Sequence, residues 1–346
     1  ATTAEIKEGF SQGEEIKWMV WNSDDNTILS QVQVEYSIGD EYFSCNDLIN
    51  ISEINALSAI TQEIILPDGW FIWSTYLEPD STGIDKIVTN IVENVDIIKT
   101  YNGNVYWPLF GINNIGDITN GEGYYIKMNE IDTLRINGYP LSNDFTVEMP
   151  GGWYLTGYPR KNQINAEDAM SPIYEELVII KDYLGLVYWP LVNINTIGDM
   201  KPGYGYYINT TNPVSLNYFS SDNSRFYSDD FYDFKSVYYS ELKPTGNNMT
   251  LAIPNDSWIE IPNNGDEVAI FDKDGLLVGN AKYRSEGTVV TIWGDDELTS
   301  QKEGLLIGEK FIIKLLSHDN LSEKIINVES WERGGGAYNI NEISIV

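Results

Sequence analysis

The chain has almost no cysteine and almost no histidine. Among 346 residues, Cys45 is the only cysteine and His318 is the only histidine. These counts exclude an intrachain disulfide and a zinc site made of cysteine and histidine ligands. No apolar run approaches the roughly 18 residues that span a bilayer. The first residues also lack the basic and apolar regions of a signal peptide, so we expect any export signal to lie upstream or to have been removed.

Basic residues are scarce as well. The sequence has 21 lysines and arginines against 52 aspartates and glutamates, which gives a formal net charge of -31. A polyanion repels nucleic acid and anionic membranes, so we expect no nucleic-acid partner and no membrane insertion. An acidic, well-solvated surface is the simplest interpretation of this charge, and binding of divalent cations is the alternative.

The chain is rich in internal repetition, on two scales. The segment 99–127 matches the segment 181–209 at 18 of 29 positions, including the string Val-Tyr-Trp-Pro-Leu at 105–109 and 187–191. Repetition at a fixed period indicates an array of similar modules. In each copy the apolar residues change from helical to strand-like spacing. We therefore predict two tandem small α+β modules, at residues 59–141 and 142–219.

One helix is expected in each α+β module. In the first, the apolar positions from Ile84 to Val95 predict a helix of about 13 residues. In the second, the positions from Ala166 onward repeat this spacing, with Asn165 placed as an N-cap. Pro172 lies inside the second pattern and should kink or split that helix.

The second repeat links the two ends of the chain. Elements of the N-terminal segment return 295 positions later without a gap: Lys7-Glu8-Gly9, Gly13-Glu14, Gly39 and Asn46 become Lys302-Glu303-Gly304, Gly308-Glu309, Gly334 and Asn341. We predict that residues 1–58 are the C-terminal half of a module whose complete copy occupies residues 237–346. Residues 220–236 would then be a linker packed along a neighbour.

The complete copy has the pattern of an all-β module. Short strands recur every 8 to 12 residues between turn signals, which is typical of a β-sandwich. The expected fold class is therefore mainly β and multi-domain, with β-sandwich modules flanking the two tandem small α+β modules.

Particular strings also resemble a known kind of protein. Thr-Gly-Asn-Asn-Met-Thr at 245–250 and Trp-Gly-Asp-Asp at 293–296 resemble a β-module of large secreted cell-surface proteins of marine Bacteroidota, which often carry a type IX secretion signal. The tandem modules, with Gly-Trp at 69–70 and 152–153, resemble a unit found beside it. The resemblance implies an extracellular or cell-surface location without assigned chemistry. Similar modules in virion proteins leave a virion surface as the alternative.

Two pairs of aromatic residues are candidate ligand contacts: Tyr106, Trp107, Tyr188 and Trp189. Alternation along a strand directs one member of each pair inward and the other outward. Packing in the core explains most of these rings. An outward row on both modules would suit stacking against a repetitive surface glycan.

One acidic segment has the opening spacing of a calcium loop. Asp272 and Asp274 are the candidate metal ligands, but the twelfth position is Tyr283 and the flanking residues predict strands. A hairpin turn is the main interpretation and a β-type calcium site is the alternative. No other cofactor is expected.

Residues for catalysis are few. His318 lies in a predicted loop without a partner histidine, and Cys45 is expected to be buried as a small apolar residue. Asp117 and Asp199 occupy the same place in both α+β modules, which favours a structural Asx turn over an acid–base pair. We therefore expect no catalytic residue and no enzyme.

The incomplete module has a physical consequence. Leaving roughly 1000 Å² of apolar surface in water would forfeit on the order of 25 kcal/mol, more than the net stability of a domain. We expect polypeptide outside this chain, from other copies or segments of the same protein, to complete residues 1–58. The sequence thus favours a non-enzymatic extracellular structural or adhesive repeat protein assembled through β-strand complementation, with a virion fibre or capsid decoration and a carbohydrate-binding protein as alternatives.

Overall fold

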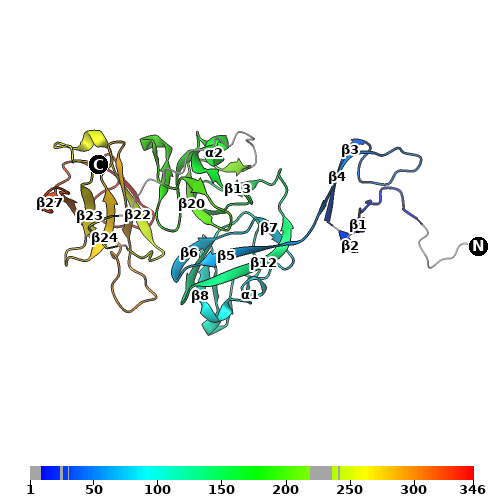
Figure 1. Cartoon of the computed structure of the whole chain (residues 1–346), viewed down its shortest axis with the longest axis horizontal. Coiled ribbons are helices and arrows are strands. Elements are labelled where there is room, and N and C mark those ends of the chain that lie inside the picture. The colour runs from blue at the N-terminus through cyan, green and yellow to red at the C-terminus, as the bar shows by residue number, and fades with distance from the viewer. Residues whose placement is uncertain (1–8, 24–25, 30, 219–235, 241) are drawn as a thin grey trace, which may run out of the picture. The chain divides into compact units, whose positions relative to one another are not determined.

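The computed structural model describes residues 9–23, 26–29, 31–218, 236–240 and 242–346 (Figure 1). All of the expected linker except Ser236 therefore lies outside the described residues. The chain is mainly β and divides into two compact units. One unit comprises residues 1–61 with 78–80 and 137–140, and the other comprises residues 62–77, 81–136 and 141–346.

The N-terminal unit is built from two antiparallel strand pairs. Strand β1 (Val20–Asn22) pairs with β2 (Thr27–Leu29), and β3 (Gln31–Ile38) pairs with β4 (Asn50–Leu57). A separate three-stranded sheet has the order β5-β12-β7, with bounds Ile60–Leu66, Asp132–Pro140 and Leu77–Pro79.

Each tandem repeat forms a five-stranded sheet of the same design. The first has the order β10-β9-β8-β11-β6, and the second has the equivalent order β18-β17-β16-β20-β14. The strands of the first are Ile112–Asn113, Val105–Trp107, Val95–Lys99, Tyr124–Met128 and Gly69–Trp73. Those of the second are Ile194–Asn195, Val187–Trp189, Leu177–Lys181, Gly205–Thr210 and Gly152–Gly157.

The second repeat also contains two short strand pairs, and each repeat contains a 3₁₀ turn. Strand β13 (Val147–Met149) pairs with β21 (Val214–Leu216), and β15 (Ile164–Asn165) pairs with β19 (Asp199–Met200). The Trp-Pro-Leu strings form the 3₁₀ turns η2 (Pro108–Phe110) and η4 (Pro190–Val192), because proline fixes the first position of each turn.

The predicted helix of the first repeat is wrong in length. Helix α1 covers only Ile84–Ile87, and the 3₁₀ turn η1 (Val92–Asn94) follows it. The helix ends where Val88 leaves helical geometry and where the Thr89 hydroxyl bonds back to the Asp85 carbonyl at 2.8 Å. Two consecutive β-branched residues weaken helix propensity here, so apolar spacing alone overestimated the helix.

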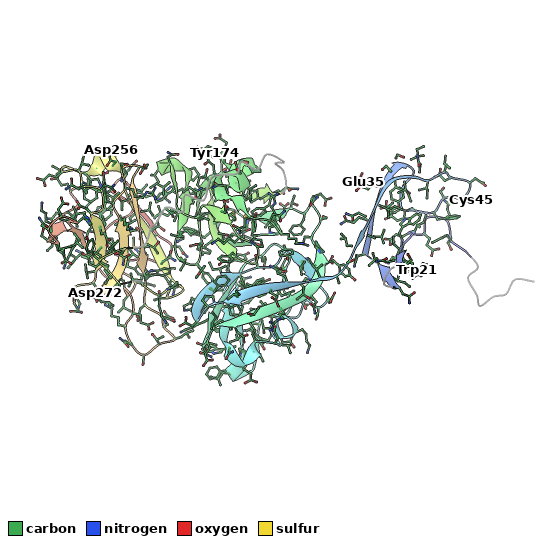
Figure 2. The ribbon with its side chains drawn as sticks, in the orientation of Figure 1. Trp21, Glu35, Cys45, Tyr174, Asp256 and Asp272 are labelled. Atoms are coloured by element: carbon green, nitrogen blue, oxygen red, sulfur yellow. The ribbon has the colours of Figure 1, made fainter. Side chains whose placement is uncertain are left out.

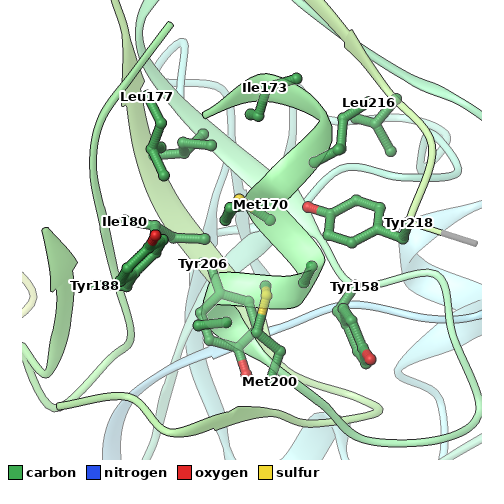
Figure 3. Close-up of a cluster of buried hydrophobic side chains, with 14 of the residues drawn as sticks. Tyr158, Met170, Ile173, Leu177, Ile180, Tyr188, Met200, Tyr206, Leu216 and Tyr218 are labelled. Atoms are coloured by element: carbon green, nitrogen blue, oxygen red, sulfur yellow. The ribbon is translucent and has the colours of Figure 1, made fainter. Parts of the chain in front are cut away.

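The helix of the second repeat follows the prediction more closely. Helix α2 spans Ala166–Met170 and passes into the 3₁₀ turn η3 (Ser171–Ile173), so Pro172 splits the helix as expected. The Asn165 side chain caps it by accepting from the Glu167 amide at 3.0 Å. Met170, Ile173 and Ile180 belong to the buried cluster between helix and sheet (Figure 3).

The two repeats join through a pseudo-twofold arrangement of backbone contacts. Trp73 of the first repeat forms an antiparallel β-bridge with Tyr204 of the second. Thr156, which is equivalent to Trp73, forms the same bridge with Glu122, which is equivalent to Tyr204. The Ser74 amide donates to the Gly203 carbonyl at 3.0 Å, and the equivalent Gly157 amide donates to Gly121 at 2.7 Å.

Glycine makes this close approach feasible. A Cβ on Gly205 would meet Ile72 Cγ2 at 2.5 Å, and one on Gly123 would meet the Thr156 carbonyl oxygen at 2.8 Å. The two Gly-x-Gly strings, at residues 121–123 and 203–205, therefore belong to the junction between the repeats.

The C-terminal module consists of two sheets facing a shared core. One has the order β25-β22-β28 and the other β24-β23-β26-β27. Strand β22 pairs with β28 in parallel and with β25 in antiparallel orientation. The bounds of β22 to β28, with the 3₁₀ turn η5 after β22, are Asn248–Ile253, Asn255–Ser257 (η5), Glu267–Phe271, Leu277–Lys282, Thr288–Trp293, Ile312–Leu316, Glu323–Ile326 and Ile343–Ile345.

We expect Gly205→Ala and Gly123→Ala each to lower the free energy of unfolding by about 1–3 kcal/mol, because the added methyl groups force the repeats apart. Gly335→Ala is the matched control, since its Cβ would have no neighbour within 4 Å and its φ is not positive. Denaturant unfolding monitored by tryptophan fluorescence measures all three. Equal stability of the Gly205 and Gly335 variants would contradict the junction.

Candidate functional site: covered faces of the repeats and an open half-module

The aromatic pairs divide between the two faces of each repeat sheet. Tyr106 and Tyr188 are buried, and Tyr188 belongs to the cluster around α2. Trp189 is fully buried as well, in a second cluster that contains Ala252 and Ile345 of the C-terminal module. Trp107 is half-buried, and its ring meets the edge of Phe110 at 4.7 Å. Trp189 therefore packs between the second repeat and the C-terminal module and is not accessible to a sugar in this structure.

Trp189 defines the outer face of the second repeat, meaning the sheet face opposite α2. Ile179, Val187 and Ile194 share this face and pack with the C-terminal module in the same cluster. The Thr291 hydroxyl also donates to the Gly185 carbonyl at 2.7 Å. This face is thus a continuous apolar contact between the repeat and β22, β25 and β28.

A lysine lies over a tryptophan on the outer face of each repeat. Lys99 Nζ is 4.5 Å from the centre of the Trp70 ring, and Lys181 Nζ is 4.7 Å from the centre of the Trp153 ring. Trp153 stacks on Tyr207 at 4.8 Å between ring centres. Contacts from Tyr207 to Tyr125 and from Tyr125 to Trp70, at 6.3 and 6.2 Å, extend the aromatic row across both repeats.

In the first repeat, one carboxylate of the C-terminal module fixes this arrangement. Asp296 Oδ2 accepts from Trp70 Nε1 and from Lys127 Nζ, both at 2.8 Å. Burial alone would raise the Asp296 pKa, but the hydrogen bonds from Lys127 and Trp70 outweigh burial and hold that pKa below its ordinary value. Removing the carboxylate would leave the buried Trp70 Nε1 without its acceptor.

In the second repeat, neutral amides replace the carboxylate. Lys181 Nζ donates to Asn248 Oδ1 at 2.7 Å, and Asn341 Nδ2 donates to the Tyr207 hydroxyl at 3.0 Å. Complete burial lowers the pKa of Lys181 to about 7. The lysine is therefore at the edge of losing its charge at neutral pH.

The candidate calcium ligands have other partners. Asp272 is buried: its Oδ1 accepts from the Asp274 and Leu276 amides at 2.8 and 2.7 Å, and its Oδ2 accepts from Lys302 Nζ at 2.7 Å. Asp274 is exposed and pairs with Lys273. Among the residues that the structure describes, no group of three or more His, Cys, Asp or Glu side chains is arranged to hold a metal ion. Asp272 closes the turn between β23 and β24.

Cys45 is exposed, so its expected burial is wrong. Its counterpart Ile340 is exposed too, because this position lies in a surface turn of both copies. His318 is exposed, as expected, and its Nδ1 lies 2.6 Å from the Tyr238 hydroxyl.

Asparagines hold the turns that precede the repeated aspartates. Asp117 accepts from the Thr82 hydroxyl at 2.8 Å. The turn amides of Gly116 and Gly198 instead donate to the side chains of Asn113 and Asn195, at 2.9 and 3.0 Å.

Several backbone bonds of the C-terminal module recur at the equivalent positions of the N-terminal unit. The Gly13 amide donates to Phe43 O at 2.8 Å, and the Gly308 amide donates to Tyr338 O at 2.7 Å. The bridge between Glu15 and Tyr42 returns as Lys310 with Ala337. The pairing of β1 with β2 likewise has the register of β26 with β27, 295 positions later. The sequence alignment of the two halves therefore holds in three dimensions.

The same unit nevertheless has no core. Not one of the described residues between 9 and 61 is buried. Phe10 is 50% exposed where its counterpart Leu305 is 1% exposed, and Leu48 is 67% exposed where Ile343 is 3% exposed. Trp21 is also exposed, and it projects from the ribbon of this unit in Figure 2. We refer to residues 9–58 as the open half-module.

Sequence reasoning missed the residues that hold the modules together. Trp70, Lys99 and their counterparts Trp153 and Lys181 lie in repeated strings, and this repetition was a usable signal for their role in packing. Asp296 had no such signal, because its role depends on a contact 226 positions away along the chain.

Comparison with known proteins identified no relative of this chain among family models or curated proteins. In the part of the chain that the structure describes, no helix has the length and apolar character needed to cross a membrane.

We expect Trp189→Ala to cost about 3–5 kcal/mol of unfolding free energy, because it empties a closed apolar contact. Trp107→Ala is the matched change in the sister repeat and should cost less than half as much, since Trp107 is only partly buried. Chemical denaturation of both variants tests this. Similar losses for the two variants would show that Trp189 is not distinguished by its contact with the C-terminal module.

The lowered pKa of Lys181 should make stability depend on pH. Between pH 7.5 and 9.5 Lys181 is neutral when folded and protonated when unfolded, so the unfolded state binds more protons. Stability should therefore rise with pH by about 1.4 kcal/mol per pH unit from this residue. The neighbouring Asp182, whose pKa burial raises to about 7, is ionised throughout most of that range. Lys181→Met should remove this part of the slope, whereas Lys273→Met, at an exposed site, should leave it unchanged.

Proposed function

We propose that this chain is a non-enzymatic structural or adhesive segment of an extracellular repeat protein and that it assembles through β-strand complementation. The observation that carries the proposal is the open half-module, which has the hydrogen bonds of a sandwich half but none of its burial. A sheet with uncovered apolar residues and unpaired edges adds strands from another polypeptide readily.

The other features of the chain fit this role. The repeats and the C-terminal module pack through extensive contacts that include Trp189 and Asp296. In this proposal they are the stable part of the chain, and the open half-module is the adhesive segment. The strong negative charge keeps such a segment soluble until it meets its specific partner. The resemblance to secreted cell-surface modules supports an extracellular location, in a filament or surface layer.

The test is the molar mass in solution of the full chain and of residues 59–346, measured by light scattering on a sizing column over a range of concentrations. With no donor present, we expect the open half-modules of two copies to cover each other, so that the full chain associates and the shortened chain remains monomeric. A full chain with Trp21→Ser and Leu48→Ser should also associate less, while Lys273→Ser serves as a surface control. A monomeric full chain at all concentrations would contradict assembly through this segment.

A further inference from the structure

The complete C-terminal module shows which strands its own second half requires. Strand β23 pairs with β26 in antiparallel orientation, placing Ile270 opposite Ile313 and Ala269 opposite Lys314. Strand β22 pairs with β28 in parallel, placing Leu251 opposite Ser344. These two strands cover the second half from both sheets of the sandwich.

The open half-module has the matching positions without these neighbours. Its residues 17–21 correspond to β26, and its residues 48–50 correspond to β28. Strand β1 is only three residues long and belongs to a two-stranded sheet, whereas β26 has five residues and lies inside a four-stranded sheet. The strand is shorter where its neighbour is missing, because ladder hydrogen bonds form on one side only.

Aromatic side chains of the open half-module occupy positions that belong to the core of the complete module. Phe10 and Phe43 stack at 5.7 Å between ring centres, and their counterparts Leu305 and Tyr338 lie in the buried core of the complete module. Trp18 corresponds to Ile313 of the same core. These side chains, exposed or only partly buried here, therefore occupy positions that lie in the interior of the complete sandwich.

Resting on the proposed function, we propose that the open half-module binds the N-terminal half of another sandwich module of this kind. The donor supplies one strand antiparallel to Lys17–Trp21 and a second strand parallel to Leu48–Asn50, in the register of β23 and β22. Residues 237–295 of this chain are already engaged with residues 302–346, so the donor lies outside residues 1–346.

The donor can be imitated with the chain's own sequence. Because the two halves align at an offset of 295, joining residues 237–295 directly to Ala1 of the full chain reproduces the spacing of the complete module. We expect amide hydrogen exchange at residues 17–21 and 48–50 to slow on the order of 100-fold relative to the unextended chain. The control extension carries Leu251→Asp and Ile270→Asp, which bury charge in the donor core and should abolish protection.

Side-chain misfit in the hybrid core is tested separately. A second extended chain carries Trp18→Ile and Trp21→Leu, which restore the residues of the complete module. Protection in either extended chain supports the proposal, and its absence from both overturns it.

The register has its own test. In a Cys45→Ser background, Ala269→Cys in the extension and Met19→Cys should form a disulfide under mild oxidation, because opposed antiparallel residues lie within disulfide range. The same extension with Trp21→Cys, two positions away, should not. A crosslink at Trp21 instead of Met19 would overturn the inferred register.

These experiments distinguish failure of the proposed donor from failure of the proposed assembly function. Protection in the extended chain, together with a monomeric unextended chain, supports the partner and contradicts self-assembly. An unextended chain that associates, with no protection in either extended chain, supports assembly and overturns this partner.

Discussion

The structure depends on one constraint: an apolar sheet face must be covered by another layer. In the second repeat, α2 covers the inner face of the sheet and the C-terminal module covers the outer face around Trp189. The repeat closes its inner face with its own helix, but its outer face is closed only by the C-terminal module, so the repeat and the module are stable as a pair. This explains why both belong to one compact unit although the sequence marks them as different modules.

Duplication lets the same outer face take different polar partners. Both repeats place a lysine over a tryptophan. In the first repeat the carboxylate of Asp296 accepts from the nearby Lys127, whereas in the second the amide of Asn248 accepts from Lys181, the lysine over the tryptophan. The carboxylate suits the first repeat because Lys127 adds a second positive charge there, where the equivalent residue of the second repeat is the neutral Asn209. The charge of the partner residue in the C-terminal module thus matches the exchange of Lys127 for Asn209 between the two repeats.

The sequence was sufficient for features that depend on local periodicity and repetition. The C-terminal module consists of short strands, as the spacing of its turn signals predicted, and Pro172 splits its helix for a local steric reason. The helix at Ile84 was overestimated because buried apolar residues in a turn mimic helical spacing. The Gly-x-Gly junction and Asp296 were missed because their roles arise from contacts between distant segments, which no local pattern encodes.

A comparison of the two sandwich halves constrains what covers the open one. The core position Ile313 is replaced by Trp18, and Leu316 is replaced by Trp21, so the open half presents larger side chains at both positions. Protein interiors are close-packed, and an added indole requires smaller neighbours or a shifted sheet. A natural donor should therefore share the strand order and register of β22 and β23 while carrying smaller side chains opposite positions 18 and 21. The half-module accordingly favours a related but distinct donor over an identical copy of residues 237–295, and such selectivity is how a repetitive polypeptide keeps its modules from pairing at random.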